Sequence, residues 1–217
     1  MRVRIKICGI TDPAAAVAAS DTGADAVGFV FYPPSPRHLE PDAATDLARH
    51  VSPLVTRVAV FRSPESGEIK DVVSRFHPHV IQVEPSAQSV AAIPDSVALL
   101  PVFHEGPHLE DEVAAFIPRS GAAPTIVLEA AGTGGRGLAP DWDRAAKLAK
   151  STNLVLAGGL SPDNVADAIR LVRPWAVDVS SGVESSPGVK DPKLIAAFVA
   201  AVRETERQVS ASMETLP

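Results

Sequence analysis

Short strand-like runs alternate with longer helix-like runs eight times along this chain of 217 residues. The strand-like runs are rich in Val, Ile, Leu and Phe, a pattern typical of parallel strands that are buried on both faces. They occupy residues 3–10, 25–32, 56–63, 80–85, 98–104, 124–130, 153–160 and 176–183. This repeat constrains the fold more than any other feature of the sequence.

The repeat predicts the fold class. Eight β/α units in one domain fit a closed (β/α)8 barrel, the TIM barrel, better than an open, doubly wound sheet with helices on both faces, which is the alternative. We expect the barrel to occupy residues 1–207 as a single domain, and the polar residues 208–217 to form a frayed tail. In such a barrel, functional side chains come from the carboxyl ends of the strands and the loops that follow them.

Charge and cysteine content narrow the classes of partner. The formal net charge is −6 and the Lys and Arg residues are scattered, which argues against nucleic acid or an anionic membrane surface. The sequence shows no run as apolar as a transmembrane helix, no signal peptide before the first strand and a single cysteine, so we expect a cytoplasmic protein. A small anionic substrate is compatible with this charge. We expect a monomer or a homodimer.

The single cysteine lies in the first expected strand, within VRIKICGITDP. Side chains alternate across a strand, so Lys6 and Cys8 should face the inside of the barrel while Ile5 and Ile7 pack under the helices. A free cysteine is usually a small buried hydrophobic residue. At the mouth of a barrel, with an ammonium two residues away that favours the thiolate, it could instead act as a base or nucleophile. The residues alone weight the two interpretations equally.

Glycine-containing loops follow the seventh and eighth expected strands, at residues 157–164 and 178–191. Close backbone approach at glycine and the N–H groups of a following helix suit a phosphate, and these two loops are the frequent phosphate site of this barrel. Ordinary turn glycines and helix caps are the structural alternative, but two such loops at adjacent strand ends favour phosphate. The small residues that would serve are Gly158, Gly159, Ser180, Ser181 and Gly182.

Acidic residues are expected on the inner face of the strands. Glu129 ends the sixth strand on the same face as Val127, and a carboxyl group at the mouth suits a general acid if its surroundings keep it protonated. Asp178 shares a strand face with Ser180, so it should point inward beneath the phosphate loops. The loop after Glu129, residues 130–137, is rich in glycine but matches no dinucleotide fingerprint.

The loop after the second strand, FYPPSPRHL, is stiffened by its prolines and presents Arg37. A guanidinium held at the mouth can bind a carboxylate through two hydrogen bonds, and an ordinary surface arginine is the equally weighted alternative. The histidines do not have the spacing of metal ligands, so we predict no metal site.

Together these segments resemble the phosphoribosylanthranilate isomerase family of tryptophan biosynthesis. The resemblance runs from KICGIT at residues 6–11 to PGVKD at residues 187–191. Between them, the family's motifs occur in the family's order as GADAVGFVFYPPSPR, a GG-x-G stretch before Asp141-Trp142, GGLSPDNV and AVDVSSGVE. Matches at several strand ends, in order, are far more specific than any single motif.

The resemblance implies an Amadori rearrangement of N-(5-phosphoribosyl)anthranilate to 1-(2-carboxyphenylamino)-1-deoxyribulose 5-phosphate, without cofactor or metal. It implies that Cys8 is the general base, that Glu129 is the general acid, and that Arg37 binds the anthranilate carboxylate. It also implies that the small residues of the last two loops bind the phosphate. Other contacts with the substrate are implied for Lys6, Gln82 and Asp178.

Some positions depart from the family's pattern. The acid is ordinarily aspartate, and Glu129 is one methylene longer. The fourth strand usually ends in Gln-Leu-His-Gly but here reads Gln82-Val83-Glu84-Pro85, which exchanges an imidazole for a carboxylate on the inner face. The GG-x-G loop is usually followed by lysine, where this chain has Leu138. Two other functions therefore stay open: a related barrel enzyme that acts on another phosphosugar, and a non-catalytic protein that binds a phosphorylated ligand.

Overall fold

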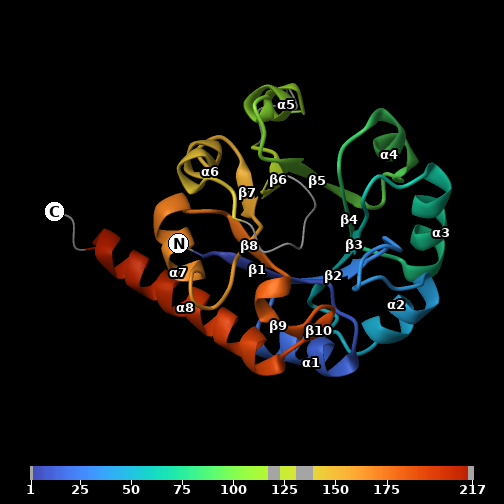
Figure 1. Ribbon diagram of the computed structural model, residues 1–217, viewed down its shortest axis with the longest axis horizontal. Coiled ribbons are helices and arrows are strands. Elements are labelled where there is room, and N and C mark those ends of the chain that lie inside the picture. The colour runs from blue at the N-terminus through green and yellow to red at the C-terminus, as the bar shows by residue number, and fades with distance from the viewer. Residues whose placement is uncertain (1, 117–122, 131–138, 215–217) are drawn as a thin grey trace.

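The structure is a computed structural model that describes residues 2–116, 123–130 and 139–214. Within these residues, eight parallel strands close into a barrel in chain order, with β8 paired to β1 (Figure 1). The predicted (β/α)8 barrel is therefore confirmed, and the open doubly wound sheet is excluded. The barrel strands are β1 Arg4–Cys8, β2 Ala26–Val30, β3 Thr56–Val60, β4 Val80–Val83, β5 Ala98–His104, β6 Thr125–Glu129, β7 Asn153–Leu156 and β8 Ala176–Val179.

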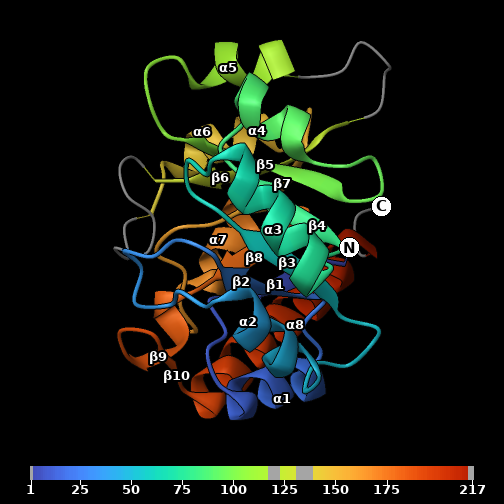
Figure 2. The same ribbon diagram turned by 90° about the vertical axis from the view of Figure 1, so that its right-hand side faces the viewer.

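Helices surround the barrel in the order of the chain (Figure 1). They are α1 Pro13–Thr22, α2 Pro41–Ala48, α3 Ser66–Phe76, α4 Ala87–Ala92, α5 Leu109–Phe116, α6 Trp142–Leu148, α7 Val165–Val172 and α8 Pro192–Glu214. After β8 the chain forms a 3-10 turn at Ser181–Val183 and an antiparallel hairpin of β9 Glu184–Ser186 and β10 Val189–Lys190. This hairpin lies beside the loop that follows β2 (Figure 2).

Alternation along the strands divides the core into two layers. The larger layer lies between strands and helices and includes Ile5, Ile7 and Phe29, which are fully buried. The smaller layer fills the inside of the barrel with residues from β5 to β8, among them Val102, Val127 and Val155. Because the interior is filled by side chains, ligands can reach the barrel only at its two ends.

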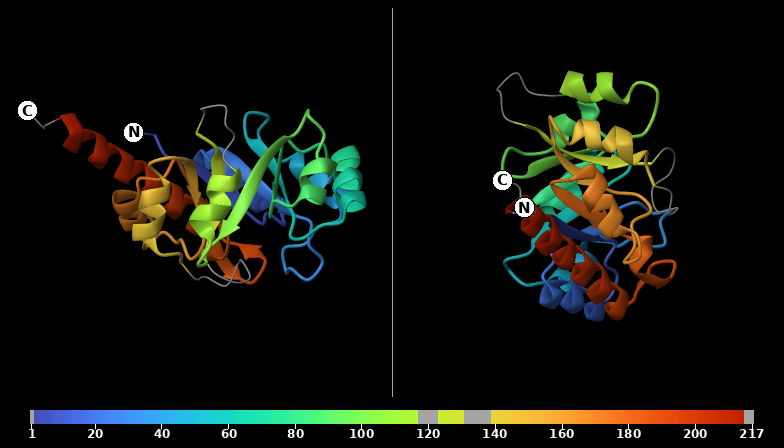
Figure 3. Two further views of the ribbon diagram at one scale, coloured as in Figure 1. Left: turned by 90° about the horizontal axis from the view of Figure 1, so that it is seen from above. Right: turned by 90° about the vertical axis from the view of Figure 1, so that its left-hand side faces the viewer.

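The last helix, α8, packs on the barrel by an apolar stripe in which Ile195, Phe198 and Val202 are fully buried. It continues past residue 207, where the sequence analysis ends the barrel, and the polar stretch expected to be frayed is helical as far as Glu214 (Figure 3). A helix satisfies its backbone hydrogen bonds internally, so polar side chains alone do not end it. Among the described residues, no helix is long and apolar enough to cross a membrane.

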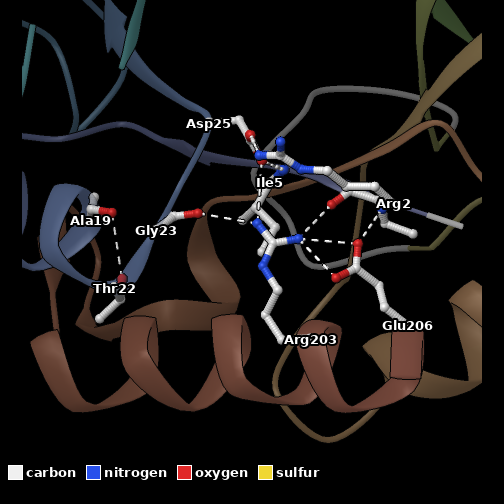
Figure 4. A network of polar contacts seen from close by, with 9 residues as sticks. Arg2, Ile5, Ala19, Thr22, Gly23, Asp25, Arg203 and Glu206 are labelled. Atoms are coloured by element: carbon white, nitrogen blue, oxygen red, sulfur yellow. Dashed lines mark hydrogen bonds and ion pairs between the residues drawn. The ribbon is translucent and has the colours of Figure 1, made fainter. Parts of the chain in front are cut away.

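A polar network attaches α8 to the amino ends of β1 and β2 (Figure 4). The guanidinium of Arg203 donates to the carbonyl oxygens of Val3, at 2.9 Å, and Gly23, at 3.2 Å, and also contacts Asp25. Glu206 accepts hydrogen bonds from the backbone N–H of Val3 and from Arg203. These contacts fix the end of the barrel opposite to the one expected to be functional.

Candidate active site

A cavity of about 450 Å³ lies at the carboxyl ends of the strands. Cys8 from β1, Gln82 from β4, His104 from β5 and Glu129 from β6 all line it, and the loop after β2 covers one side. The family resemblance implies that Cys8 is the general base and Glu129 the general acid. The two side chains do face one cavity, from different strands. We call it the mouth cavity.

Lys6 and Asp178 form a buried ion pair beneath this cavity. The ammonium of Lys6 donates to Asp178 Oδ2 at 2.7 Å, and both side chains are almost completely excluded from solvent. Burial alone would lower the pKa of Lys6, but the charge of Asp178 raises it above the ordinary value, so the ammonium keeps its proton. Both residues point inward, as the alternation of their strands predicts.

The thiol of Cys8 lies close to this ammonium. A Cβ atom added to Gly28 on β2 would lie 2.9 Å from Cys8 Sγ and 3.3 Å from Lys6 Nζ, so both atoms border the space that the missing side chain leaves. Burial raises the pKa of Cys8, whereas the ammonium lowers it. The net shift is upward: Lys6 does favour the thiolate, as the sequence analysis expects, but burial outweighs it in the free protein.

The carboxyl group of Glu129 faces the cavity from β6. Burial raises its pKa above the usual range for a carboxyl group, and the negative charge of Asp178 raises it further. The charges of His104, Lys6 and Arg62 partly oppose this shift. A carboxyl group that holds its proton to higher pH is suited to donate it to a bound ligand.

Glu84 departs from the family's pattern, and basic side chains on both sides of it balance its negative charge. Its Oε1 accepts a hydrogen bond from His104 Nε2 at 2.9 Å and lies 3.9 Å from Arg62 Nε. The carboxylate that follows β4 is therefore flanked by two basic side chains, Arg62 after β3 and His104 at the end of β5. Sequence reasoning missed His104, although the alternation that turns Glu129 inward on β6 also turns His104 inward on β5.

Buried oxygen atoms beside the cavity lack partners. Among the described residues, no hydrogen-bond donor reaches Gln82 Oε1 or Asp178 Oδ1, although only 2% of Gln82 and 5% of Asp178 is exposed. An unsatisfied buried acceptor costs stability, so such atoms are usually explained by a ligand, water or ion. Both residues are ones that the sequence analysis assigns to substrate contacts.

The loops after β7 and β8 lie against each other. A Cβ atom on Gly182 would stand 1.9 Å from the carbonyl oxygen of Leu160, so only glycine permits this contact. Gly158 and Gly159 adopt positive φ angles of 87° and 62°, which glycine tolerates without strain. The residues predicted to bind phosphate are thus brought together, and Ser180 lines the mouth cavity.

The guanidinium of Arg37, which was expected to bind a carboxylate at the mouth, is paired with a carboxylate of the chain itself. Its Nε and Nη2 donate to the two carboxylate oxygens of Glu184 at 2.7 and 2.8 Å. Lys190 also donates to Glu184, at 2.6 Å. Ser35 and Pro36 line the mouth cavity but Arg37 itself does not. Sequence reasoning missed Glu184 and Lys190. The one indication in the sequence was that both lie in the loop of Ser181 and Gly182, which were predicted to bind phosphate.

The glycine-rich loop after Glu129 is described only at Ala130, and Leu138 lies outside the described residues. The expectations for that loop and for the change at Leu138 therefore concern parts of the chain that the structure does not describe.

Taken together, the fold and the cavity define a (β/α)8-barrel enzyme with ionisable side chains at the carboxyl ends of its strands. The family model described as "N-(5'phosphoribosyl)anthranilate (PRA) isomerase" matches residues 5–201. The chain therefore belongs to the N-(5'-phosphoribosyl)anthranilate isomerase family.

Individual relatives agree with this family along nearly their whole length. The N-(5'-phosphoribosyl)anthranilate isomerase of Rhodopseudomonas palustris is 39% identical over 216 residues, which cover 95% of this chain and 99% of the relative. That of Dechloromonas aromatica is 41% identical, with coverages of 96% and 100%. The solved structure of phosphoribosyl anthranilate isomerase from Thermotoga maritima is 36% identical, with a TM-score of 0.81, and covers 94% of this chain and 100% of its own.

One solved structure holds a ligand. It is a phosphoribosyl anthranilate isomerase in complex with reduced 1-(o-carboxyphenylamino)-1-deoxyribulose 5-phosphate, 36% identical to this chain with a TM-score of 0.80. It covers 94% of this chain and 100% of its own.

Proposed function

We propose that this chain isomerises N-(5'-phosphoribosyl)anthranilate to 1-(2-carboxyphenylamino)-1-deoxyribulose 5-phosphate in tryptophan biosynthesis. Membership of the isomerase family along residues 5–201 supports the reaction. The single observation that carries the mechanism is that a thiol from β1 and a protonatable carboxyl group from β6 line the same cavity. The reaction needs one group to give a proton and another to take one, and it needs no change of oxidation state overall.

Glu129 is the proposed acid. Its carboxyl group gives a proton to the ring oxygen of the ribose, the C1–O bond breaks, and the anthranilate nitrogen supplies electrons to form an iminium ion at C1. The raised pKa of Glu129 supports this role, because the group enters the reaction in its protonated form.

Cys8 is the proposed base. As a thiolate it removes the proton from C2, whose electrons form a C1–C2 double bond and neutralise the iminium. The resulting enolamine becomes the ketone when C1 gains a proton and the C2 hydroxyl loses one, so atoms and charges balance. The ammonium of Lys6 supports the thiolate at the moment of reaction, since it is the neighbouring charge that lowers the pKa of Cys8.

The other predicted residues are proposed to hold the substrate. The paired loops after β7 and β8 would bind the phosphate through Gly158, Gly159, Ser180, Ser181 and Gly182. Gln82 and Asp178 would accept hydrogen bonds from the sugar through their unpartnered oxygens. Arg37 would bind the anthranilate carboxylate with the N–H groups that Glu184 leaves free, while Glu184 fixes the orientation of the guanidinium.

The test is an activity assay with the purified protein. Phosphoribosylanthranilate is added, and loss of its anthranilate-type fluorescence reports turnover. We expect Cys8→Ala to abolish turnover and Glu129→Ala to lower it by about 10²- to 10⁴-fold. Glu110→Ala removes an exposed carboxylate from α5, outside the barrel, and is the matched control with unchanged turnover.

The same assay decides between the proposed function and its alternatives. Phosphate-dependent binding without turnover would favour an enzyme for another phosphosugar or a non-catalytic binding protein. Turnover that survives Cys8→Ala would refute the proposed base.

Assembly and location form a separate part of the proposal. One solved relative consists of monomers generated from the dimeric phosphoribosylanthranilate isomerase of Thermotoga maritima. Monomeric and dimeric forms are therefore both compatible with a barrel of this kind. For this chain we propose a monomer or a homodimer in the cytoplasm, which works on a small phosphosugar without nucleic acid or membrane. Light scattering coupled to size-exclusion chromatography measures the assembly directly.

A further inference from the structure

Four neighbouring strands carry charged or ionisable side chains to one side of the mouth cavity. Arg62 follows β3, Glu84 follows β4, His104 ends β5 and Glu129 ends β6, and all four line the cavity. We call them the rim cluster. The proposed reaction uses only Glu129, so the other three need their own explanation.

The imidazole of His104 is held on both sides. Its Nε2 donates to Glu84 Oε1 at 2.9 Å, and its Nδ1 lies 3.4 Å from the carbonyl oxygen of Ala130, the residue after Glu129. A ring with a polar partner at each nitrogen has few orientations left, although 26% of its side chain is exposed. Since one partner follows β4 and the other follows β6, the ring spans the space between these two strand ends.

His104 is also the neighbour of Glu129. The two residues pair in the register of β5 and β6, and both side chains face inward, so they stand one strand apart, at about 4.8 Å. The charge of His104 counters the rise in the pKa of Glu129 that burial and Asp178 produce. Other ionisable side chains around Glu129 are Lys6 and Cys8 from β1, Asp178 from β8, and Arg62 and Glu84 from the segments that follow β3 and β4.

We propose that Glu84 and His104 form a positioning pair for Glu129, in which the Glu84 carboxylate fixes the imidazole and the imidazole controls how Glu129 is oriented and holds its proton. The proposal rests on the role of Glu129 in the proposed function. Neither Glu84 nor His104 exchanges a proton with the substrate; both act through the acid. Without Glu84, the ring loses the partner at Nε2 and can turn toward solvent.

The first test measures the acid directly, without turnover. The protein is labelled with 13C at the glutamate side-chain carboxyl, and the Glu129 resonance is assigned by its absence from Glu129→Gln. We expect its titration midpoint to move to higher pH by about one unit in His104→Gln, because an opposing charge is lost while an amide remains to meet Glu84. His79→Gln, at the opposite end of β4, removes an exposed imidazole and is the matched control.

The second test asks whether Glu84 acts through His104. Glu84→Gln should shift the same midpoint in the wild-type background and leave it unchanged in the His104→Gln background. In the fluorescence assay, each single variant should lower kcat by about tenfold and change KM little, and the double variant should be no worse than His104→Gln alone.

The outcomes separate this inference from the proposed function. If turnover depends on Cys8 and Glu129 but the Glu129 midpoint is the same in wild type and His104→Gln, the positioning pair is refuted and the isomerase remains. Additive effects of the two variants would mean that Glu84 acts on its own, which also refutes the pair. If the wild-type chain shows no turnover, the proposed function fails, while the titration still reports whether His104 controls Glu129.

Discussion

The two ends of the barrel each hold a cavity of similar size. The mouth cavity at the carboxyl ends of the strands measures about 450 Å³, and a second cavity at the amino ends measures about 510 Å³. The first is lined by a thiol, carboxyl groups, an imidazole and an amide. The second is lined mostly by aliphatic side chains, and Arg4 at its edge stacks 3.9 Å from the ring centre of Trp175. Volume therefore does not distinguish the functional end, whereas chemistry does.

The ends also differ in how well their polar groups are satisfied. At the amino end, Arg203 joins α8 to β1 and β2 through backbone and carboxylate partners. At the carboxyl end, Gln82 and Asp178 keep buried oxygens without partners in the described part of the chain, and burial raises the pKa of Cys8. We infer that the amino end is built for stability and that the carboxyl end gives up stability for chemistry.

Lys6→Met tests the comparison between the two ends of the barrel, and its expected effect is the largest. It removes the ammonium beside Cys8 and leaves Asp178 buried without its partner. We expect kcat/KM to fall by about 10³-fold and the free energy of unfolding to fall by about 3 kcal/mol. The fluorescence assay and chemical denaturation measure the two quantities.

A second substitution separates the two effects of Lys6. In Lys6→Met combined with Asp178→Asn, no uncompensated charge stays buried, so most of the lost stability should return while activity does not. Recovery of both would mean that Lys6 serves only to neutralise Asp178.

Arg203→Ala tests the amino end, with the opposite expectation. The carbonyl oxygens of Val3 and Gly23 lose a donor, which should lower the free energy of unfolding by about 2 kcal/mol. For a chain of this size the melting temperature should fall by about 4–8 °C, while kcat of the folded protein stays unchanged. Arg170→Ala, on the exposed surface of α7, is the control with little effect. A loss of kcat at unchanged stability would reverse the assignment of the two ends.

The same contrast shows what the sequence could predict. Periodicity of two along the strands correctly placed Lys6, Cys8, Glu129 and Asp178 inside the barrel, because each strand fixes the direction of its own side chains. The strand–helix repeat likewise predicted the closed barrel. The sequence was sufficient to predict a feature wherever that feature depends on a single strand or helix.

Contacts between distant loops could not be read from the sequence. Arg37 meets Glu184 across 147 positions of the chain, and nothing near either residue indicates that partner. His104 ends β5 and Glu84 follows β4, and only the closed barrel brings them together. The extent of α8 was missed for another reason: a polar composition was taken to indicate fraying, although helix continuation depends on backbone hydrogen bonds.

Gln82→Met tests the same comparison between the two ends of the barrel, with a smaller expected change in stability and activity. Methionine has nearly the shape of glutamine but lacks the buried oxygen that has no partner among the described residues. We expect stability to hold or rise by about 1 kcal/mol, and KM to rise about tenfold, which corresponds to about 1.4 kcal/mol of lost binding. Thermal melting and steady-state kinetics measure the two changes. If stability falls as far as in Arg203→Ala, the unpartnered oxygen is not a cost to the fold.

Glu184→Gln gives the smallest and most conditional effect, because Glu184 lies at the carboxyl end but is paired like the residues of the amino end. Burial alone would raise its pKa, yet Arg37 and Lys190 hold it below the usual range. Such a carboxylate contributes stability above the pKa of the unfolded chain, near 4.3, and loses it as pH falls through the lower folded value. Melting temperatures of wild type and variant should therefore differ at pH 7 and converge below about pH 4.

Because the pair is mostly shielded from solvent, the difference at pH 7 should survive high salt. A difference that disappears in salt would make it an ordinary surface pair, and pairing would no longer separate stabilising charges from functional ones at this end of the barrel.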